Sequence, residues 1–135
     1  MKITMSIEGD ILKNSRIVAV VGLSGNPDRP SYRVASYLKE NGYTIIPVNP
    51  SERMILEARC YPSLKSIHGQ VEIVDIFRKS EDVLPIVIDS IEIGANTIWM
   101  QEGVINEEAA NRAKEAGLKV VMDKCMLKEH QKLAE

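Results

Sequence analysis

The sequence predicts an α/β fold built on a five-stranded parallel sheet with helices on both faces. Short runs rich in Val and Ile alternate along the chain with longer segments in which apolar residues recur every third or fourth position. This alternation is typical of β–α–β units, which pair their strands in parallel. The chain of 135 residues holds no internal repeat and no long linker, so we expect one domain over residues 1–135.

The strands are recognised as short apolar runs rich in β-branched residues. The first run ends at Val21 and opens into a loop that contains two glycines. The run at 71–77 alternates less than an exposed strand would, which is typical of a strand buried on both faces. We expect strands at residues 16–21, 44–48, 71–77, 97–101 and 118–122.

The helices are indicated by apolar spacing and by residues that begin or end a helix. Gly42 follows the first of them, where glycine tolerates the positive φ of a helix end, and Asn106 stands at an N-cap. Pro85 is expected near the start of its helix. Helices are expected at residues 31–41, 81–94, 106–117 and 124–134, with a further edge helix within 1–14 and a loop with one short helix at 49–70.

Composition and charge restrict the classes of function. The net charge of −2 gives no reason to expect nucleic acid or an acidic membrane surface as a partner. No apolar run approaches the roughly 20 residues that span a bilayer, and the first ten residues include acids where a signal peptide would be apolar. We therefore expect a cytoplasmic protein in which Cys60 and Cys125 are reduced thiols.

The loop after the first strand has the features of a phosphate site. It reads V-V-G-L-S-G-N-P-D-R-P-S and leads into a helix N-terminus, where free N–H groups and the helix dipole favour a phosphate. Gly22 permits a sharp turn, Gly25 permits a close approach and Ser24 offers a hydroxyl. Arg29 and Arg33 can pair with phosphate oxygens. A tight turn that binds nothing is the alternative.

The glycine spacing of this loop does not match the common nucleotide motifs. A dinucleotide site needs G-x-G-x-x-G and an acid near the end of the second strand. Here Asp28 takes the third glycine position, and the second strand ends in Val48-Asn49-Pro50 without the acid. A P-loop is excluded because no G-K-[S/T] occurs. The loop suits a diphosphate while the rest of the site does not suit NAD, and an NAD(P)-binding oxidoreductase stays an alternative.

Six segments in order give the chain a specific resemblance to a known family. They are V-V-G-L-S-G-N-P-D-R-P-S-Y at 20–32, I-I-P-V-N-P at 45–50, C-Y-P-S-L at 60–64, V-D-I-F-R-K-S-E at 74–81, W-M-Q-E-G-V at 99–104 and A-G-L-K-V-V-M-D-K-C at 116–125. The chain resembles the small stand-alone CoA-binding proteins, which are related to the CoA-binding domain of the succinyl-CoA synthetase α subunit. This resemblance implies a Rossmann-like three-layer domain that holds the ADP part of CoA or of an acyl-CoA.

The resemblance also implies which residues contact each part of CoA. Arg29 or Arg33 is expected to join the loop residues at the diphosphate. The implied contacts are Gly22, Ser24, Asn26 and Pro27 for the diphosphate, Val48, Asn49 and Pro50 for ribose and adenine, Phe77, Arg78 and Ser80 closing over the adenosine, and Gln101 and Glu102 along the pantetheine arm.

The 3′-phosphate of CoA needs a cation, and here the chain departs from the family pattern. Many relatives place a lysine directly after the N-P of the second strand. This chain has Ser51 and Glu52 there, followed by Arg53. The candidates for the 3′-phosphate contact are Arg53, Arg29, Arg33 and Arg78.

No catalytic group stands out in the sequence. Cys125 has His130 nearby, but a spacing of five does not set the two side by side on a helix, so we interpret Cys125 as structural. His68 and His130 fit no zinc pattern. We therefore expect a CoA-binding protein without catalysis of its own, with a thiol-active redox protein using Cys125 as a further alternative. The expected partner is the small molecule CoA; the sequence names neither a protein partner nor an oligomeric state.

Overall fold

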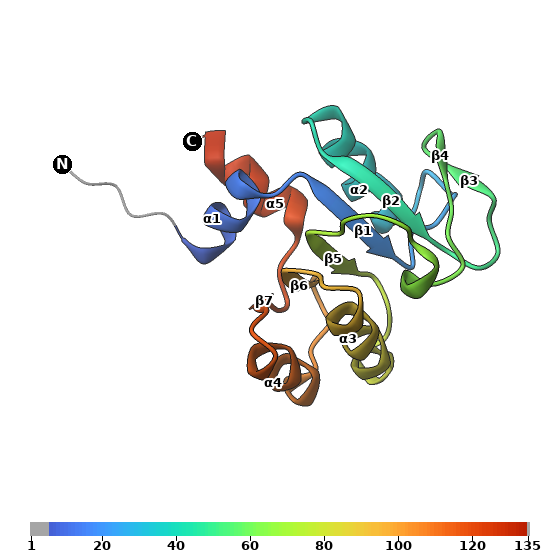
Figure 1. Cartoon of the computed structure of the whole chain (residues 1–135). Coiled ribbons are helices and arrows are strands. Elements are labelled where there is room, and N and C mark those ends of the chain that lie inside the picture. The colour runs from blue at the N-terminus through green and yellow to red at the C-terminus, as the bar shows by residue number, and fades with distance from the viewer. Residues whose placement is uncertain (1–5, 135) are drawn as a thin grey trace.

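The computed structural model describes residues 6–134 and is organised around a parallel sheet of five strands (Figure 1). The strands run in the spatial order β2-β1-β5-β6-β7, and every neighbouring pair is parallel. They span Thr44–Val48 (β2), Ile17–Val21 (β1), Ile73–Ile76 (β5), Thr97–Met100 (β6) and Lys119–Val121 (β7). The predicted fold class, an α/β fold of Rossmann-like type with a five-stranded parallel sheet, is confirmed.

Helices cover both faces of the sheet, which makes the three layers visible in Figure 1. One face is covered by α1, α2 and α5, whose buried side chains share a core with Val18, Val20 and Trp99. The other face is covered by α3 and α4, which pack on the remaining strand residues. The helices span Ile7–Asn14 (α1), Pro30–Glu40 (α2), Val83–Glu92 (α3), Glu107–Glu115 (α4) and Met126–Gln131 (α5), with 3₁₀ turns at Leu64–Ser66 (η1), Ser80–Asp82 (η2) and Lys132–Ala134 (η3).

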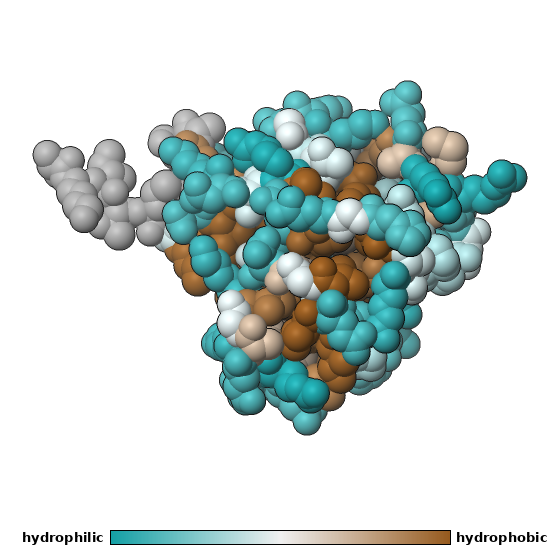
Figure 2. All heavy atoms as spheres, in the orientation of Figure 1, coloured by the Kyte–Doolittle hydropathy of each residue, from teal (hydrophilic) through white to brown (hydrophobic). Residues whose placement is uncertain are grey.

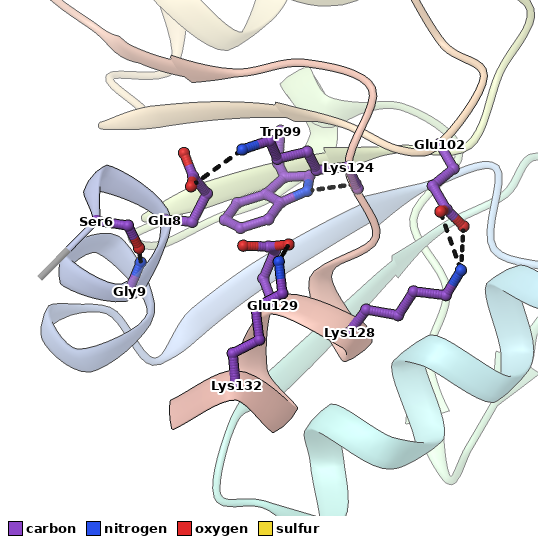
Figure 3. A network of polar contacts seen from close by, with 9 residues as sticks. All are labelled: Ser6, Glu8, Gly9, Trp99, Glu102, Lys124, Lys128, Glu129 and Lys132. Carbon is purple, nitrogen blue, oxygen red and sulfur yellow. Dashed lines mark hydrogen bonds and ion pairs between the residues drawn. The ribbon is translucent and has the colours of Figure 1, made fainter. Parts of the chain in front are cut away.

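Local sequence signals explain where several helices begin. Pro30 occupies the first turn of α2, where its missing N–H costs no helical hydrogen bond. Asn106 caps α4 as predicted, because its side-chain oxygen accepts a hydrogen bond from the Ala109 N–H (2.9 Å). Ser6 caps α1 in the same way through the N–H of Gly9 (Figure 3).

The limits of several elements differ from the predicted ranges. The strand predicted at 71–77 is confined to Ile73–Ile76, and the helix predicted at 81–94 begins with the 3₁₀ turn η2 before α3. The last helix divides into α5 and η3. The edge helix predicted within 1–14 is present as α1, while residues 1–5 lie outside the described residues. These differences fall at element ends, where helix and strand geometry frays.

The connection from β2 to β5 contains a hairpin that the sequence did not predict. Strands β3 (Met54–Ile55) and β4 (Ala58–Arg59) pair antiparallel, and η1 supplies the one short helix that was expected there. Leu56 and Glu57, which join the two strands, have φ values of 52° and 62°. Such turns normally carry Asn or Gly, so the sequence M-I-L-E-A-R lacks the usual hairpin signal.

Two surface features complete the description of the fold. None of the described helices has the length and apolar character that a bilayer-spanning helix requires. Apolar side chains reach the surface over α3 and α4 in Figure 2, and Ile88 and Ile91 are the partly exposed residues that line the groove between these helices.

Candidate functional site

The candidate site lies where the strand order of the sheet reverses. From β1 the chain goes to β2 on one side, and the later strands β5, β6 and β7 lie on the other side. In open parallel sheets ligands bind beyond the carboxyl ends of the strands at such a point. Gly22 and Phe77 directly follow β1 and β5 there, and the loop after β1 starts at this edge.

Gly22 is required by the close approach of the two loops. Its φ is +88°, and a Cβ atom at this position would lie 2.3 Å from the carbonyl oxygen of Phe77. The Gly22 N–H donates to the carbonyl of Val48 (3.1 Å), so this residue joins the ends of three strands. The positive φ and the close contact with Phe77 explain why glycine occupies this turn, as the sequence predicted.

Hydrogen bonds between residues close in sequence fix the shape of the loop after β1. The Ser24 Oγ accepts from the Asn26 N–H and the Asn26 Oδ1 accepts from the Asp28 N–H, each at 3.0 Å. Ser31 Oγ accepts from the Ser24 N–H (3.0 Å), which ties the loop to the first turn of α2. Arg33 donates to the Asp28 carbonyl (3.2 Å). The loop is thus held in place by its own side chains.

A cavity of about 840 Å³ opens at this edge of the sheet, within the range of small-molecule sites. The loop after β1 forms one wall, the turn after β5 forms a second, and the loop after β6 with the start of α5 forms a third. Seven of the predicted site residues line it: Gly22, Ser24, Arg29, Phe77, Arg78, Gln101 and Glu102. Residues that the sequence did not assign to the site also line it: Pro30, Ser31, Val34, Lys79, Asp82, Val104 and Cys125.

A second hollow of about 370 Å³ shares Arg78 and Asp82 with this cavity. Val48 and Pro50, the predicted ribose and adenine contacts, line it. Its other walls come from the loop at 62–64 and from α3, and were not predicted as site residues. A signal for the 62–64 loop was present, because C-Y-P-S-L is one of the six segments of the family resemblance.

Five predicted site residues line neither hollow: Asn26, Pro27, Arg33, Asn49 and Ser80. Asn49 braces the loop after β1, since its Nδ2 donates to the Leu23 carbonyl (2.9 Å). Ser80 joins η2 to the loop after β6, since its Oγ accepts from the Ile105 N–H (3.0 Å). These residues shape the walls of the hollows, and their direct contact with a ligand stays a prediction.

Charges of both signs surround the cavity. Arg29, Arg78 and Lys79 line it together with Asp82 and Glu102. Glu102 is bound to Lys128 of α5, whose Nζ lies 3.0 and 3.1 Å from the two carboxylate oxygens (Figure 3).

Two of the arginines proposed for the phosphates, Arg33 and Arg53, line neither hollow. The carboxylate of Glu52 lies against the loop after β1: its Oε2 is 2.9 Å from the point where a Cβ of Gly25 would stand.

An ionisable residue is buried directly beside the cavity wall. Asp75, in the middle of β5, is fully buried, and the Gln101 Nε2 donates to its Oδ1 at 2.6 Å. Among the described residues, nothing hydrogen-bonds the buried Oδ2. Burial raises the pKa of Asp75 to about 7, against the opposing effect of the Gln101 hydrogen bond. Sequence reasoning missed Asp75, although an acid inside the apolar run I-V-D-I-F was the available signal.

Cys125 and His130 have separate surroundings, and no hydrogen bond joins them within the described residues. Cys125 lines the cavity as a free, partly exposed thiol. The His130 Nδ1 lies 2.8 Å from the Tyr37 hydroxyl, and burial lowers the pKa of His130. Within residues 6–134, no three His, Cys, Asp or Glu side chains gather as metal ligands do.

Trp99 and one ion pair hold elements around the cavity together. Trp99 is fully buried in β6 and donates from Nε1 to the Lys124 carbonyl (2.8 Å). The Nζ of Lys124 lies 3.2 Å from a carboxylate oxygen of Glu8, so the chain between β7 and α5 is tied to α1 (Figure 3). The residue directly before Cys125 is therefore tied to β6 and to α1.

The chain is similar in sequence and in fold to several known proteins. A family model described as a CoA binding domain matches residues 16–131. The uncharacterized protein YneT of Bacillus subtilis is 42% identical over 121 residues, covering 90% of each chain. A solved structure of a hypothetical protein from Pyrococcus horikoshii OT3 superposes with a TM-score of 0.90 at 37% identity, over 100% of both chains.

An enzyme is also among the relatives. The ADP-forming acetate–CoA ligase II of Archaeoglobus fulgidus is 30% identical over 99 residues, which is 72% of this chain. The chain spans only 15% of the length of that ligase.

Proposed function

Because the chain belongs to the CoA-binding domain family, we propose that it binds coenzyme A or an acyl-CoA at the carboxyl edge of its sheet. The main support is the cavity that brings Gly22, Ser24 and Arg29 together with Arg78 and Gln101. These residues come from the ends of three strands, and their types suit a ligand that carries both a diphosphate and an amide-bearing arm.

In this proposal each part of CoA has a place. The diphosphate lies at the loop after β1, with Arg29 as its cation, because Arg29 lines the cavity and Arg33 does not. The adenosine occupies the second hollow, where Val48 and Pro50 offer apolar walls. The pantetheine arm runs past Gln101 and Glu102.

We further propose that the protein binds its ligand without catalysing a reaction. The cavity offers Cys125 as a nucleophile, but the histidine nearest in sequence is engaged with Tyr37. The ligase activity of the A. fulgidus relative belongs to a much longer protein. A role in delivering, storing or sensing CoA, or in regulating a partner, follows from binding alone. Free Cys60 and Cys125 support our proposal of a cytoplasmic site of action.

Calorimetric titration with CoA, acetyl-CoA, dephospho-CoA and NAD tests the proposal. We expect CoA or acetyl-CoA to bind at least tenfold more tightly than NAD, because the acid that binds the ribose of NAD is missing at the end of β2. Comparison of CoA with dephospho-CoA measures the contribution of the 3′-phosphate. A protein that binds NAD tightly and CoA weakly would instead support the oxidoreductase alternative, and a protein that binds no CoA species would refute the proposal.

A second candidate function, thiol exchange at Cys125, is favoured by the position of this thiol in the cavity wall. Cys125→Ser separates it from simple binding. If the protein is a binder, the variant keeps its affinity for CoA within about twofold, because Ser differs from Cys by one atom. Mass spectrometry after incubation with CoA disulfide detects a mixed disulfide, which only the thiol-active protein is expected to form.

A further inference from the structure

Burying the carboxyl group of Asp75 in the sheet lowers the stability of the fold. Its register partners are Val20 in β1 and Trp99 in β6, so it lies at the centre of the sheet. It is 0% exposed, and its Oδ2 is buried without a hydrogen-bond partner among the described residues. Buried carboxyl groups that lack partners are destabilising, and native structures rarely retain them without a reason.

The reason is found one strand away, at Gln101. This residue is 3% exposed and lines the cavity, and its Nε2 donates to Asp75 at 2.6 Å. Within the described part of the chain this is the hydrogen bond that its side chain makes. The Oδ1 of Asp75 accepts both when the carboxyl is ionised and when its proton is on the unpartnered Oδ2, so Asp75 makes the amide of Gln101 present its Nε2 to the sheet. The Oε1 at the other end of the amide is left as an acceptor for a group in the cavity.

We propose that Asp75 is a positioning residue for the CoA arm: it fixes the Gln101 amide so that Oε1 accepts a hydrogen bond from an amide N–H of the ligand. This inference rests on the proposed function, because it deepens the assignment of the same cavity. The pantetheine arm of CoA carries two secondary amides and therefore two N–H donors. A site that offers a fixed acceptor selects for such a donor, whereas a freely turning amide accepts or donates equally well.

Asp75→Asn is the variant that tests this role. Asn has nearly the same shape, but it can donate through Nδ2 or accept through Oδ1, so Gln101 is no longer held in one orientation. We expect the affinity for CoA to fall about tenfold, while the affinity for ADP, which lacks the arm, stays unchanged. Ser90→Ala is the control, because Ser90 is also fully buried but lies on α3, away from the cavity, and it should bind both ligands normally.

A second variant shows whether Asp75 acts through Gln101. Gln101→Leu removes the amide, so it should lose about tenfold in CoA affinity, and the double variant should lose no more than either single one. Calorimetric titration of all four variants and the wild type with CoA and ADP gives the comparison.

The outcomes separate this inference from the proposed function. Equal CoA affinity of Asp75→Asn and wild type would overturn the inference alone. An equal loss for CoA and ADP would also overturn it, because it would mean a general structural role. A wild-type protein that binds no CoA would overturn the inference together with the proposed function.

Discussion

At the residue scale, Gly22 meets two demands at once, a positive φ and a contact with the next loop. We predict that Gly22→Ala lowers the free energy of unfolding by about 3 kcal/mol or more, because the added Cβ meets the Phe77 carbonyl at 2.3 Å. Gly42→Ala is the matched control: φ is +92° there and nothing lies within 4 Å of the added Cβ. It should cost about 1 kcal/mol. Urea unfolding measures both, and equal losses would contradict the prediction.

Asp75 makes the stability of the protein depend on pH in an unusual direction. The carboxyl titrates at about 7 in the folded protein and at 3.8 when unperturbed. Between these values the unfolded chain releases its proton while the folded chain keeps it, so the stability falls as the pH rises. The full effect is about 4 kcal/mol at most, present below pH 4 and lost by about pH 7.

Asp75→Asn removes this titration, so we predict that the variant gains stability over wild type as the pH rises. The difference in free energy of unfolding should be small at pH 4 and reach a few kcal/mol at pH 8. Urea unfolding across this range measures it. Parallel pH profiles of the two proteins would show that the carboxyl does not titrate as its burial implies.

Glu52 places a negative charge beside the loop that we assign to the diphosphate. Its Oε2 lies 2.9 Å from the point where a Cβ of Gly25 would be. We predict that Glu52→Gln raises the affinities for CoA and for dephospho-CoA about threefold, because both ligands carry the diphosphate that the Glu52 carboxylate repels. Both gains should shrink at high salt. Glu57→Gln, which changes an exposed acid on the hairpin, should change neither affinity. Unchanged affinities of Glu52→Gln for both ligands would contradict the prediction.

At the scale of elements, the hairpin of β3 and β4 keeps two residues in the left-handed region. Glu57 has a φ of 62°, and its side chain is 93% exposed in a surface ion pair with Lys39. We predict that Glu57→Gly raises the free energy of unfolding by roughly 1 kcal/mol, since glycine relieves the strain and the ion pair contributes little. Thermal unfolding measures the gain. Glu57→Ala keeps the strain and should bring no gain, so an equal rise in both variants would contradict this reason.

The strands show which features of an element are determined by its local sequence. β2 was predicted at 44–48 and is found at Thr44–Val48, because a β-branched run follows a glycine helix stop there. The hairpin was missed because Leu56 and Glu57 are poor turn residues. Ile55 is 3% exposed, so burial of this side chain in the core outweighs the unfavourable turn.

At the scale of the whole molecule, ligand binding and folding are linked through the cavity between the strand ends. If CoA binds only the folded chain, a concentration of about one hundred times its dissociation constant adds about 2.7 kcal/mol to the free energy of unfolding. We predict a rise in Tm of about 8–12 °C with CoA at that concentration and a smaller rise with the same concentration of NAD. Differential scanning fluorimetry measures both, and an unchanged Tm with CoA would contradict the prediction.

The candidate site shows the limits of sequence reasoning at this scale. Seven predicted residues line the main cavity because they follow β1, β5 or β6. The carboxyl ends of parallel strands lie at the same edge of the sheet. Asn49 and Ser80 hydrogen-bond the walls of the hollows, and their predicted contact with a ligand stays a prediction. Cys125 and Lys79 line the cavity without having been predicted to, since their place depends on how α5 and η2 pack.

The sequence by itself determined the fold class, the family and the turn at Gly22. Periodicity, helix caps and glycine positions are local properties, and local geometry follows from them. Only the tertiary structure decided the strand order β2-β1-β5-β6-β7 and the hydrogen bond between Asp75 and Gln101. It also decided which predicted site residues line the two hollows and which hydrogen-bond their walls. These depend on which segments meet in space, and the free energy of such contacts comes from burial and packing that no single segment contains.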